Sequence, residues 1–455
     1  MKKLFIALLC PLLMQAQVNT DADFIKNLSD EVLRNGQAHD LLRELTKGIG
    51  GRLAGSPQFA KAVEWGASAL KNAGADKVIL QECMMPNWKR GGTDMASIVM
   101  IDQKKTTRKL DVLALGNSMG TGGKAITAEV IAVASFDELE AKKDQLKGKI
   151  VYYNFKFNPT NIQTFKSYGE VGQYRRNGAS RAAKYGAVGV MIRSLTEATD
   201  NNPHTGAMAY NDSFPKIPAI ALGGDDADYV WNLSKKSSFR VSITTNGHFL
   251  PDAKGHNVIA ELTGTEFPDE FITVGGHLDS WDVNEGAHDD GAGIVQTIEI
   301  LRTLKALGYK PKRSIHFVLF ANEENGLRGG SKYAEEAKAK NEKHVFALES
   351  DEGGFTPRGF GFTMSEKQFE KVQSWLPLLK PYGTEWMRKG GGGADIGPLN
   401  RLLGTPLGGY VPDDQRYFDI HHARSDVFEN VNKRELMLGA INMGAFIYLV
   451  DKYFL

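Results

Sequence analysis

Two adjacent glutamates, Glu323 and Glu324, follow the apolar run in the segment "FVLFANEENGLRGG", residues 317–330. Two ionised carboxylates beside an apolar wall repel each other, so something must offset their charge. A solvated surface turn would do this, and so would a metal ion. The pair alone does not decide between these two explanations.

Other groups that bind metals stand at the ends of further strand-like runs. They are His277 and Asp279 after "FITVGG", Asp351 after "VFALES", His421 and His422 after "RYFDI", and Asp289 and Asp290 in the loop "NEGAHDDGAG". Singly, each has an ordinary explanation as a core histidine, a helix cap or a loop acid. Together they favour one site, because ligands bind beyond the carboxyl ends of the strands in open α/β sheets.

This set contains carboxylates and imidazoles but no thiolates, which suits zinc, with cobalt or manganese as substitutes. A single catalytic zinc needs only three protein ligands. Five good ligands and spare acids instead suit two ions that share one carboxylate. Two such metals can activate water and polarise a carbonyl together, which leaves a spare glutamate as general base.

Alternating strand and helix patterns surround these residues. Strands are expected in 270–280, 313–325 and 343–354, a long helix in 291–310, and a closing amphipathic helix over 433–453. Helical periodicity in 21–75 predicts further covering helices. This alternation predicts an α/β fold, with a mostly parallel central sheet wrapped by helices.

Residues 125–246 have a different texture, with short strand candidates and none of the paired acid and histidine motifs. We expect an inserted α/β domain there, within a metal-site domain of residues 18–124 and 247–455. The alternative is a single large α/β domain.

The N-terminus has Lys2 and Lys3, an apolar run over 4–13 and a small residue at Ala16. This layout predicts a signal peptide over residues 1–17, and hence a secreted or periplasmic protein. A lipoprotein signal at Cys10 is the rival interpretation. After cleavage Cys83 is the remaining cysteine, which excludes an intrachain disulfide. The 55 basic and 54 acidic residues leave a net charge of +1, which points to neither nucleic acid nor an anionic membrane as partner.

Five stretches carry a family resemblance: "GGHLDSWDVNEGAHDDGAG", "LFANEENGLRGG", "ESDEGGFTPRGFGFTMSEK", "GGGADIGPL" and "YFDIHHARSDVFENV". With the earlier "GGRLAGSP" they resemble the zinc exopeptidases that include bacterial leucyl aminopeptidases and glutamate carboxypeptidases. The resemblance spans nearly the whole mature chain. It implies a phosphorylase/hydrolase-like fold, and it implies that the insert is a protease-associated domain.

The resemblance also implies roles for single residues. His277 and Asp351 would bind one zinc, Glu324 and His422 the other, and Asp289 would bridge the two. His422 is preferred to His421 because the family's ligand precedes an acid, here Asp426, by four residues. Asp279 would orient the His277 imidazole, and Glu323 would be the catalytic base.

The branch of plasma glutamate carboxypeptidases is the most similar, which implies a homodimer that cleaves dipeptides with both ends free. A broad aminopeptidase is the main alternative. A receptor-type ectodomain of the transferrin receptor branch, a single-zinc glutaminyl cyclase and a metal-stapled binding protein are the others.

An exopeptidase must also recognise a charged terminus of its substrate, with acids for an ammonium or arginines for a carboxylate. The sequence offers both kinds of residue near the predicted site. They are Glu349, Asp395, Asp413 and Asp414 on one side, and Arg328, Arg416 and Arg424 on the other.

Overall fold

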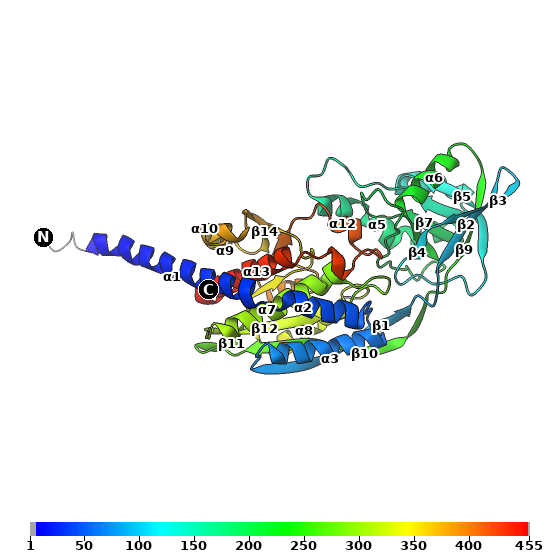
Figure 1. The fold of residues 1–455 in the computed structure, drawn as a ribbon. Coiled ribbons are helices and arrows are strands. Elements are labelled where there is room, and N and C mark those ends of the chain that lie inside the picture. Colours follow the sequence, from blue (N-terminus) through cyan, green and yellow to red (C-terminus); the bar gives the residue numbers. More distant parts are fainter. Residues whose placement is uncertain (1–5, 454–455) are drawn as a thin grey trace.

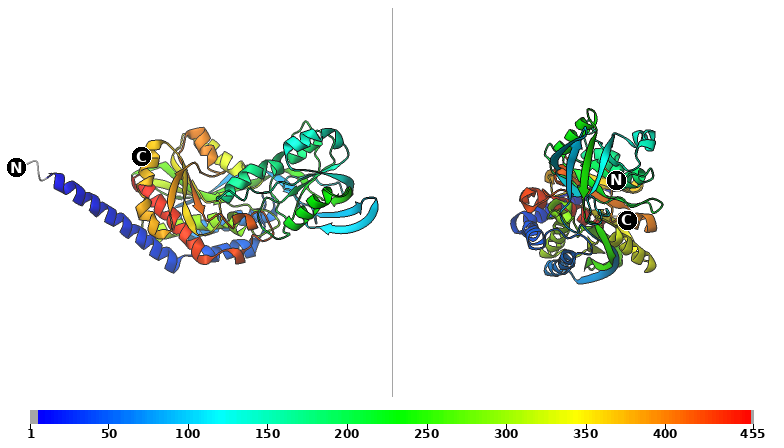
Figure 2. Two further views of the ribbon diagram at one scale, coloured as in Figure 1. Left: turned by 90° about the horizontal axis from the view of Figure 1, so that it is seen from above. Right: turned by 90° about the vertical axis from the view of Figure 1, so that its right-hand side faces the viewer.

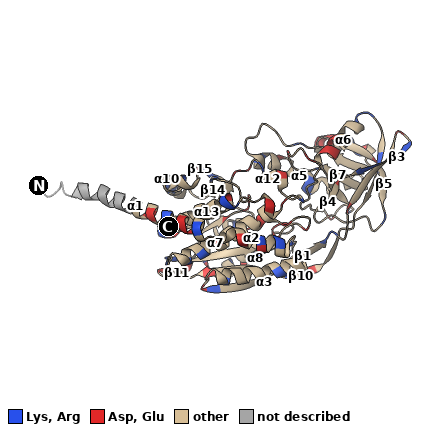
Figure 3. Ribbon diagram, in the orientation of Figure 1, with Lys and Arg blue, Asp and Glu red and all other residues tan. Residues whose placement is uncertain are grey.

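Two eight-stranded sheets organise the computed structural model, which describes residues 6–453 and, over residues 6–19, the helical backbone alone. Figure 1 shows the two sheets in two parts of the molecule, and Figure 2 shows these parts side by side along its long axis. Figure 3 shows Lys and Arg interspersed with Asp and Glu on both parts. Neither part therefore carries charge of a single sign.

The first sheet has a parallel centre and antiparallel edges. In spatial order its strands are β1 (Lys77–Lys89), β10 (His248–Leu262), β12 (Arg313–Phe320), β11 (Phe267–His277), β13 (Lys343–Glu349), β16 (Leu407–Pro412), β14 (Pro357–Thr363) and β15 (Trp386–Lys389). The central strands β12, β11, β13 and β16 run parallel to one another. The predicted α/β fold is confirmed, with antiparallel additions at both edges of the parallel centre.

Helices cover both faces of this sheet, because its central strands are apolar on both sides. On one face lie α1 (Ile6–Asn35), α2 (Ala38–Arg43), α3 (Pro57–Asn72), α7 (Ala292–Ala306) and α13 (Lys433–Tyr453), and on the other lie α8 (Arg328–Ala339) and α11 (Gly397–Leu403). Phe317 and Leu319 of β12 face the first group, and Val318 and Phe320 face the second. This alternation is the two-residue period of a strand.

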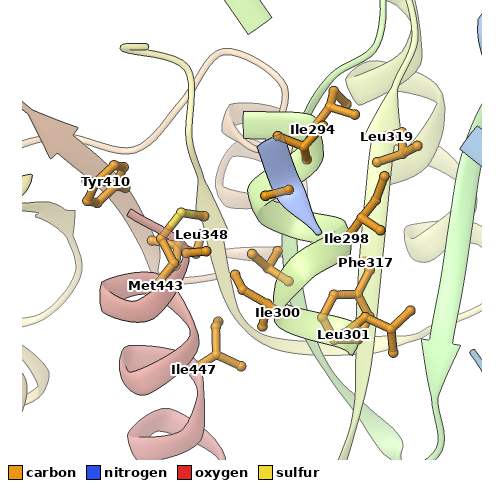
Figure 4. Close-up of a cluster of buried hydrophobic side chains, with 14 of the residues drawn as sticks. Ile294, Ile298, Ile300, Leu301, Phe317, Leu319, Leu348, Tyr410, Met443 and Ile447 are labelled. Carbon is orange, nitrogen blue, oxygen red and sulfur yellow. The ribbon is translucent and has the colours of Figure 1, made fainter. Parts of the chain in front are cut away.

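Helix α7 is buried on nearly all sides, between the sheet and α13. Figure 4 shows the side chains that pack there: Ile294, Ile298, Ile300 and Leu301 of α7, Phe317 and Leu319 of β12, Leu348 of β13, Tyr410 of β16, and Met443 and Ile447 of α13. A helix held from all sides gives a rigid support for the loop that precedes it.

The second sheet has the order β3-β2-β9-β5-β6-β7-β8-β4. Its strands are β2 (Met95–Ile101), β3 (Lys104–Leu110), β4 (Val112–Ala114), β5 (Ile126–Val133), β6 (Ile150–Tyr153), β7 (Gly189–Arg193), β8 (Ala219–Leu222) and β9 (Phe239–Thr244). Helices α4 (Phe136–Ala141), α5 (Thr164–Ala183) and α6 (Gly224–Ser234) pack against it. The shorter helices α9 (Glu366–Gln373), α10 (Leu376–Leu379) and α12 (Tyr417–Ile420) belong to the first part.

The start of the second part differs from the predicted boundary at residue 125. Strands β2, β3 and β4, which the sequence analysis assigned to the metal-site domain, pair with β9 and β8 in the second sheet. The second part therefore begins near residue 95. Short alternating strands do not reveal which sheet they will join, because the partner is set by contacts far apart in the chain.

The predicted signal peptide, residues 1–17, lies partly outside the described residues. Residues 6–17 continue into the helix that ends at Asn35. Within the described part of the chain, no helix combines the length and apolarity needed to span a bilayer.

Candidate metal centre

The carboxyl ends of the three central strands place acids and a histidine at one edge of the first sheet. His277 is the last residue of β11, Glu323 and Glu324 lie just past the end of β12, and Asp351 lies just past the end of β13. Because these strands are parallel neighbours, their carboxyl ends meet. The sequence prediction that these residues converge is confirmed.

Asp289 stands between two imidazoles. Its Oδ1 lies 3.1 Å from His277 Nε2, and its Oδ2 lies 3.2 Å from His422 Nε2. His277 Nε2 is also 3.2 Å from Asp351 Oδ1, and His422 Nε2 is 3.1 Å from Glu324 Oε2. The five residues predicted as metal ligands thus form two triads that share the Asp289 carboxylate.

The two triads are short of positive charge. Burial and the neighbouring Asp289 carboxylate raise the pKa of Glu324 well above its usual value. Burial would also raise the pKa of Asp289, but contacts with His277 and His422 hold it well below its usual value. Glu324 Oε1 and Asp289 Oδ2 are buried and have no hydrogen-bond partner among the described residues. Oxygen and imidazole donors with unused lone pairs fit divalent cations.

His421 and His422 stack on each other, with ring centroids 3.5 Å apart. Both point Nε2 toward Asp289 Oδ2, at 3.7 Å for His421 and 3.2 Å for His422. Only the His422 nitrogen is also within 3.1 Å of Glu324. The geometry therefore favours His422 as the ligand, in agreement with the sequence-based choice.

Asp279 has a different role from the predicted one. Its carboxylate is 3.8 Å from His277 Nδ1, whereas its backbone carbonyl oxygen is 3.0 Å from that nitrogen. The carboxylate instead accepts hydrogen bonds from the backbone N–H groups of Glu323, at 3.0 Å, and Glu324, at 3.3 Å. Two adjacent N–H groups at a turn hold it away from the imidazole. Asp279 therefore orients His277 through its backbone and the glutamate pair through its side chain.

Glu323 lies beside the triads without contacting either imidazole through an ion pair. It is partly buried, and burial raises the pKa of its carboxyl group to about 8. Such a value is within reach of neutral pH, as a group that both accepts and returns a proton requires.

Two further acids hold the backbone of the site. Asp426 accepts hydrogen bonds from the backbone N–H groups of His288, at 2.7 Å, and Asp289, at 3.1 Å. Asp290, which follows Asp289 through a cis peptide bond, accepts from the backbone of His277 and Gly293, both at 3.0 Å. The sequence analysis named Asp290 as a possible ligand and used Asp426 only to locate the histidine. Their positioning roles depend on contacts that spacing does not show.

The second part of the molecule also contacts the site, which the sequence analysis did not predict. His204 Nδ1 is 2.7 Å from the His421 carbonyl oxygen, and the backbone N–H of Thr205 donates to that of His422 at 2.9 Å. Gly206, with φ +129°, lies so close that an added Cβ would be 2.6 Å from His422 Nδ1. The loop 204–206 therefore clamps the backbone of the histidine pair.

A cavity of about 370 Å³ opens over the triads. The first part contributes Asp289, Glu323, Glu324, Gly326, Leu327, Asp351, Tyr417, His421 and His422, and the second part contributes Phe165, Tyr168, Arg175, Arg176, Ala207, Met208 and Ala209. Phe165 of α5 stacks on Tyr417 of α12, where the two parts meet. The volume is at the lower end for small-molecule sites.

None of the seven charged residues named for substrate termini lines this cavity, as far as the structure describes it. Asp413 pairs with Arg358, Arg424 pairs with Asp111, and Glu349 accepts from the backbone of Ile396. Most of these charges are therefore engaged elsewhere, and the sequence analysis was wrong about which charges face the substrate space.

Comparison with known proteins supports the same class of site. Residues 257–446 match the model of peptidase family M28. The chain is 34% identical over 432 residues to carboxypeptidase Q of Bos taurus, covering 94% of this chain and 88% of that protein. A peptidase M28 precursor from Shewanella amazonensis has a TM-score of 0.90 at 31% identity, covering 95% of this chain and 97% of that one. A zinc aminopeptidase from Bacillus subtilis has a TM-score of 0.64 at 20% identity, with 90% and 94% covered.

The chain belongs to peptidase family M28, and the protein is a hydrolase that acts on peptides. Its similarity to carboxypeptidase Q extends over both parts of the molecule, including the second sheet. The family predicted from the sequence motifs is confirmed.

Proposed function

We propose that this peptidase is a dinuclear zinc exopeptidase that hydrolyses short peptides, chiefly dipeptides with both termini free. The observation that carries the proposal is the Asp289 carboxylate, whose two oxygens face His277 and His422 at 3.1 and 3.2 Å. One carboxylate shared by two nitrogen- and oxygen-rich triads suits a pair of ions better than one ion.

In this proposal His277 and Asp351 hold one zinc, Glu324 and His422 hold the other, and Asp289 holds both. Bound zinc ions would supply Lewis acidity, which polarises a carbonyl and lowers the pKa of water. The zinc aminopeptidase of Bacillus subtilis, with a similar fold, supports the choice of metal.

Glu323 is the proposed general base. Its carboxylate accepts a proton from water as the peptide carbonyl is attacked, and then returns that proton to the leaving amine nitrogen. Asp279 keeps this carboxylate in place, because its own oxygens accept hydrogen bonds from the backbone of Glu323 and Glu324. Phe165 and Tyr168 on the opposite wall narrow the cavity and limit the entry of water.

The short-peptide preference rests on two observations. The cavity of about 370 Å³ is bounded by both parts of the molecule, which leaves little room for a long chain. In addition, the chain is similar over nearly its whole length to proteins named carboxypeptidase Q. We further propose that the second part is a protease-associated domain, that residues 1–17 direct the protein out of the cytoplasm, and that it acts as a homodimer.

One experiment tests the substrate class. The zinc-loaded protein is given one neutral dipeptide in three forms, free, N-acetylated and C-amidated, and the release of amino acids is measured. Cleavage of the free form alone is expected. Cleavage of the amide would instead indicate an aminopeptidase, and cleavage of the acetylated form would indicate a carboxypeptidase.

A further inference from the structure

Two arginines on one wall of the cavity have no part in the proposed chemistry. Arg175 and Arg176 lie on α5 of the second part, across from the triads, and both line the cavity. Neither makes an ion pair with any residue that the structure describes. Arginines beside a substrate cavity without an acidic partner are available to an anion from outside the protein.

Arg175 is the more constrained of the two, with 4% of its surface exposed. It donates to the Tyr168 hydroxyl at 2.6 Å, and its Nη1 lies 3.4 Å from His422 Nδ1. Its Nε is buried and has no hydrogen-bond partner among the described residues. A buried guanidinium without a counter-charge is costly, so a bound anion would relieve this cost.

Arg176 is exposed, and no described residue accepts a hydrogen bond from its side chain. Its backbone is fixed, since its carbonyl oxygen accepts from the N–H of Ala209 at 3.0 Å. The guanidinium therefore has a fixed base and a free head, which lets it close on a ligand in the cavity.

The charge balance of the cavity favours an anion at this wall. The carboxylates of Asp289, Glu323, Glu324 and Asp351 line the opposite side. Two divalent ions would balance those four negative charges, which leaves the charges of Arg175 and Arg176 uncompensated. A planar guanidinium binds a carboxylate through two parallel hydrogen bonds, so a carboxylate is the anion that fits best.

The position of Arg175 indicates which carboxylate is within reach. A single imidazole ring, that of His422, separates Arg175 Nη1 from the Glu324 carboxylate. Successive residues of an extended peptide are about 3.3–3.6 Å apart, so the carboxylate of the residue after the scissile bond falls near this wall.

We infer that Arg175 and Arg176 form a receptor for a substrate carboxylate, and that the α-carboxylate of the residue following the cleaved bond occupies it. This inference rests on the proposed function and adds the residues that select the substrate terminus. It makes the second part of the molecule a contributor to specificity.

The test uses Arg176→Ala, because this exposed side chain supports no other described contact. For the zinc-loaded enzyme, we expect kcat/KM for a free neutral dipeptide to fall at least about tenfold, which is the loss of one hydrogen bond to a charged group. The ratio of kcat/KM for the free dipeptide to that for its C-amide should fall with it. Arg176→Lys should retain an intermediate ratio, because it keeps the charge but loses the planar fork.

Lys166→Ala is the matched control, since Lys166 is an exposed cation on the same helix that does not line the cavity. A ratio in Arg176→Ala equal to that in Lys166→Ala would overturn the inference. A C-amide with a glutamate side chain at its second residue separates the two sources of carboxylate. Loss for this amide alone would overturn the α-carboxylate assignment and identify the side chain as the ligand.

Binding measurements separate this inference from the proposed function. Calorimetry on zinc-loaded Glu323→Gln should show tighter binding of the free dipeptide than of its amide, and addition of Arg176→Ala should remove the difference. If wild-type protein hydrolyses nothing while this binding difference is present, the proposed function fails and the inference stands. Hydrolysis without any such difference would have the opposite meaning.

Discussion

At the scale of single residues, neighbouring carboxylates are separated by what each one contacts. Glu324 lies 3.1 Å from the imidazole of His422, whereas Glu323 has no such contact and keeps its carboxylate toward the cavity. Their backbones share one anchor, the carboxylate of Asp279. Two acids that are adjacent in sequence can therefore take the two different roles of ligand and base.

Glu323→Gln is expected to keep its metal and lose turnover. Glutamine preserves the shape and the backbone hydrogen bond to Asp279 but cannot accept a proton from water. General acid–base catalysis contributes about 10²- to 10⁴-fold, so kcat should fall by that factor. Metal content by elemental analysis and kcat on a free dipeptide are the two measurements. Glu335→Gln, at an exposed position on α8, is the control and should match wild type.

Asp289→Asn should give the opposite pattern. It keeps the size of the side chain but removes the charge that both imidazoles face, so metal affinity should fall more than about 100-fold. Asp269→Asn, at an exposed position of β11, controls for the loss of one acid. Full metal content in Asp289→Asn after dialysis against a chelator would contradict the bridging role.

At the scale of elements, the sequence predicted the convergence of strand ends but not the supports around it. The residues His277, Glu324 and Asp351 follow buried apolar runs, and parallel strands bring such ends together by geometry. In contrast, the contact of His204 with His421 joins two sheets, and no local pattern encodes it. The misassigned role of Asp279 has the same origin, since spacing does not show which way a side chain turns.

One such support is Arg52, from the motif "GGRLAGSP". It is fully buried, and its guanidinium donates to the carbonyl oxygens of Leu278 at 2.5 Å, Glu285 at 2.8 Å and Gly286 at 3.1 Å. These carbonyls belong to the loop between His277 and Asp289. Arg52 thus fixes the segment that joins two of the proposed ligands.

Arg52→Lys should destabilise the metal-free protein by about 3 kcal/mol. A single ammonium cannot reach three separated carbonyl oxygens, and each buried carbonyl left unsatisfied costs about 1–3 kcal/mol. Urea unfolding followed by circular dichroism measures the change, with Arg401→Lys at an exposed position of α11 as control. A midpoint equal to that of the control would show that Arg52 is dispensable for the loop.

At the scale of the whole molecule, the site is a store of buried acid held between two sheets. Burial raises the pKa of Glu349 and Asp426 to about 7 and that of Glu323 to about 8. Although burial opposes a charged imidazolium, the carboxylates of Asp351 and Asp289 hold the pKa of His277 well above its usual value. Near neutral pH the folded, metal-free chain therefore binds more protons than the unfolded chain.

This difference predicts that metal removal reverses the pH dependence of stability. Where the folded state binds more protons, stability falls as pH rises, so the metal-free protein should lose about 2 kcal/mol between pH 6.5 and 8.5. Buried histidines with a pKa lowered to about 4, such as His204 and His288, are neutral in both states across this window and do not contribute.

Zinc changes the sign because its ligands bind it only when deprotonated, so raising the pH strengthens binding and stabilises the folded state. Urea midpoints at pH 6.5 and 8.5, with chelator and with excess zinc, measure both slopes. The midpoint should fall with pH in chelator and should hold or rise in zinc. Parallel slopes would mean that the buried acids keep their ordinary pKa values, and that the charge shortage of the two triads does not govern the stability of the molecule.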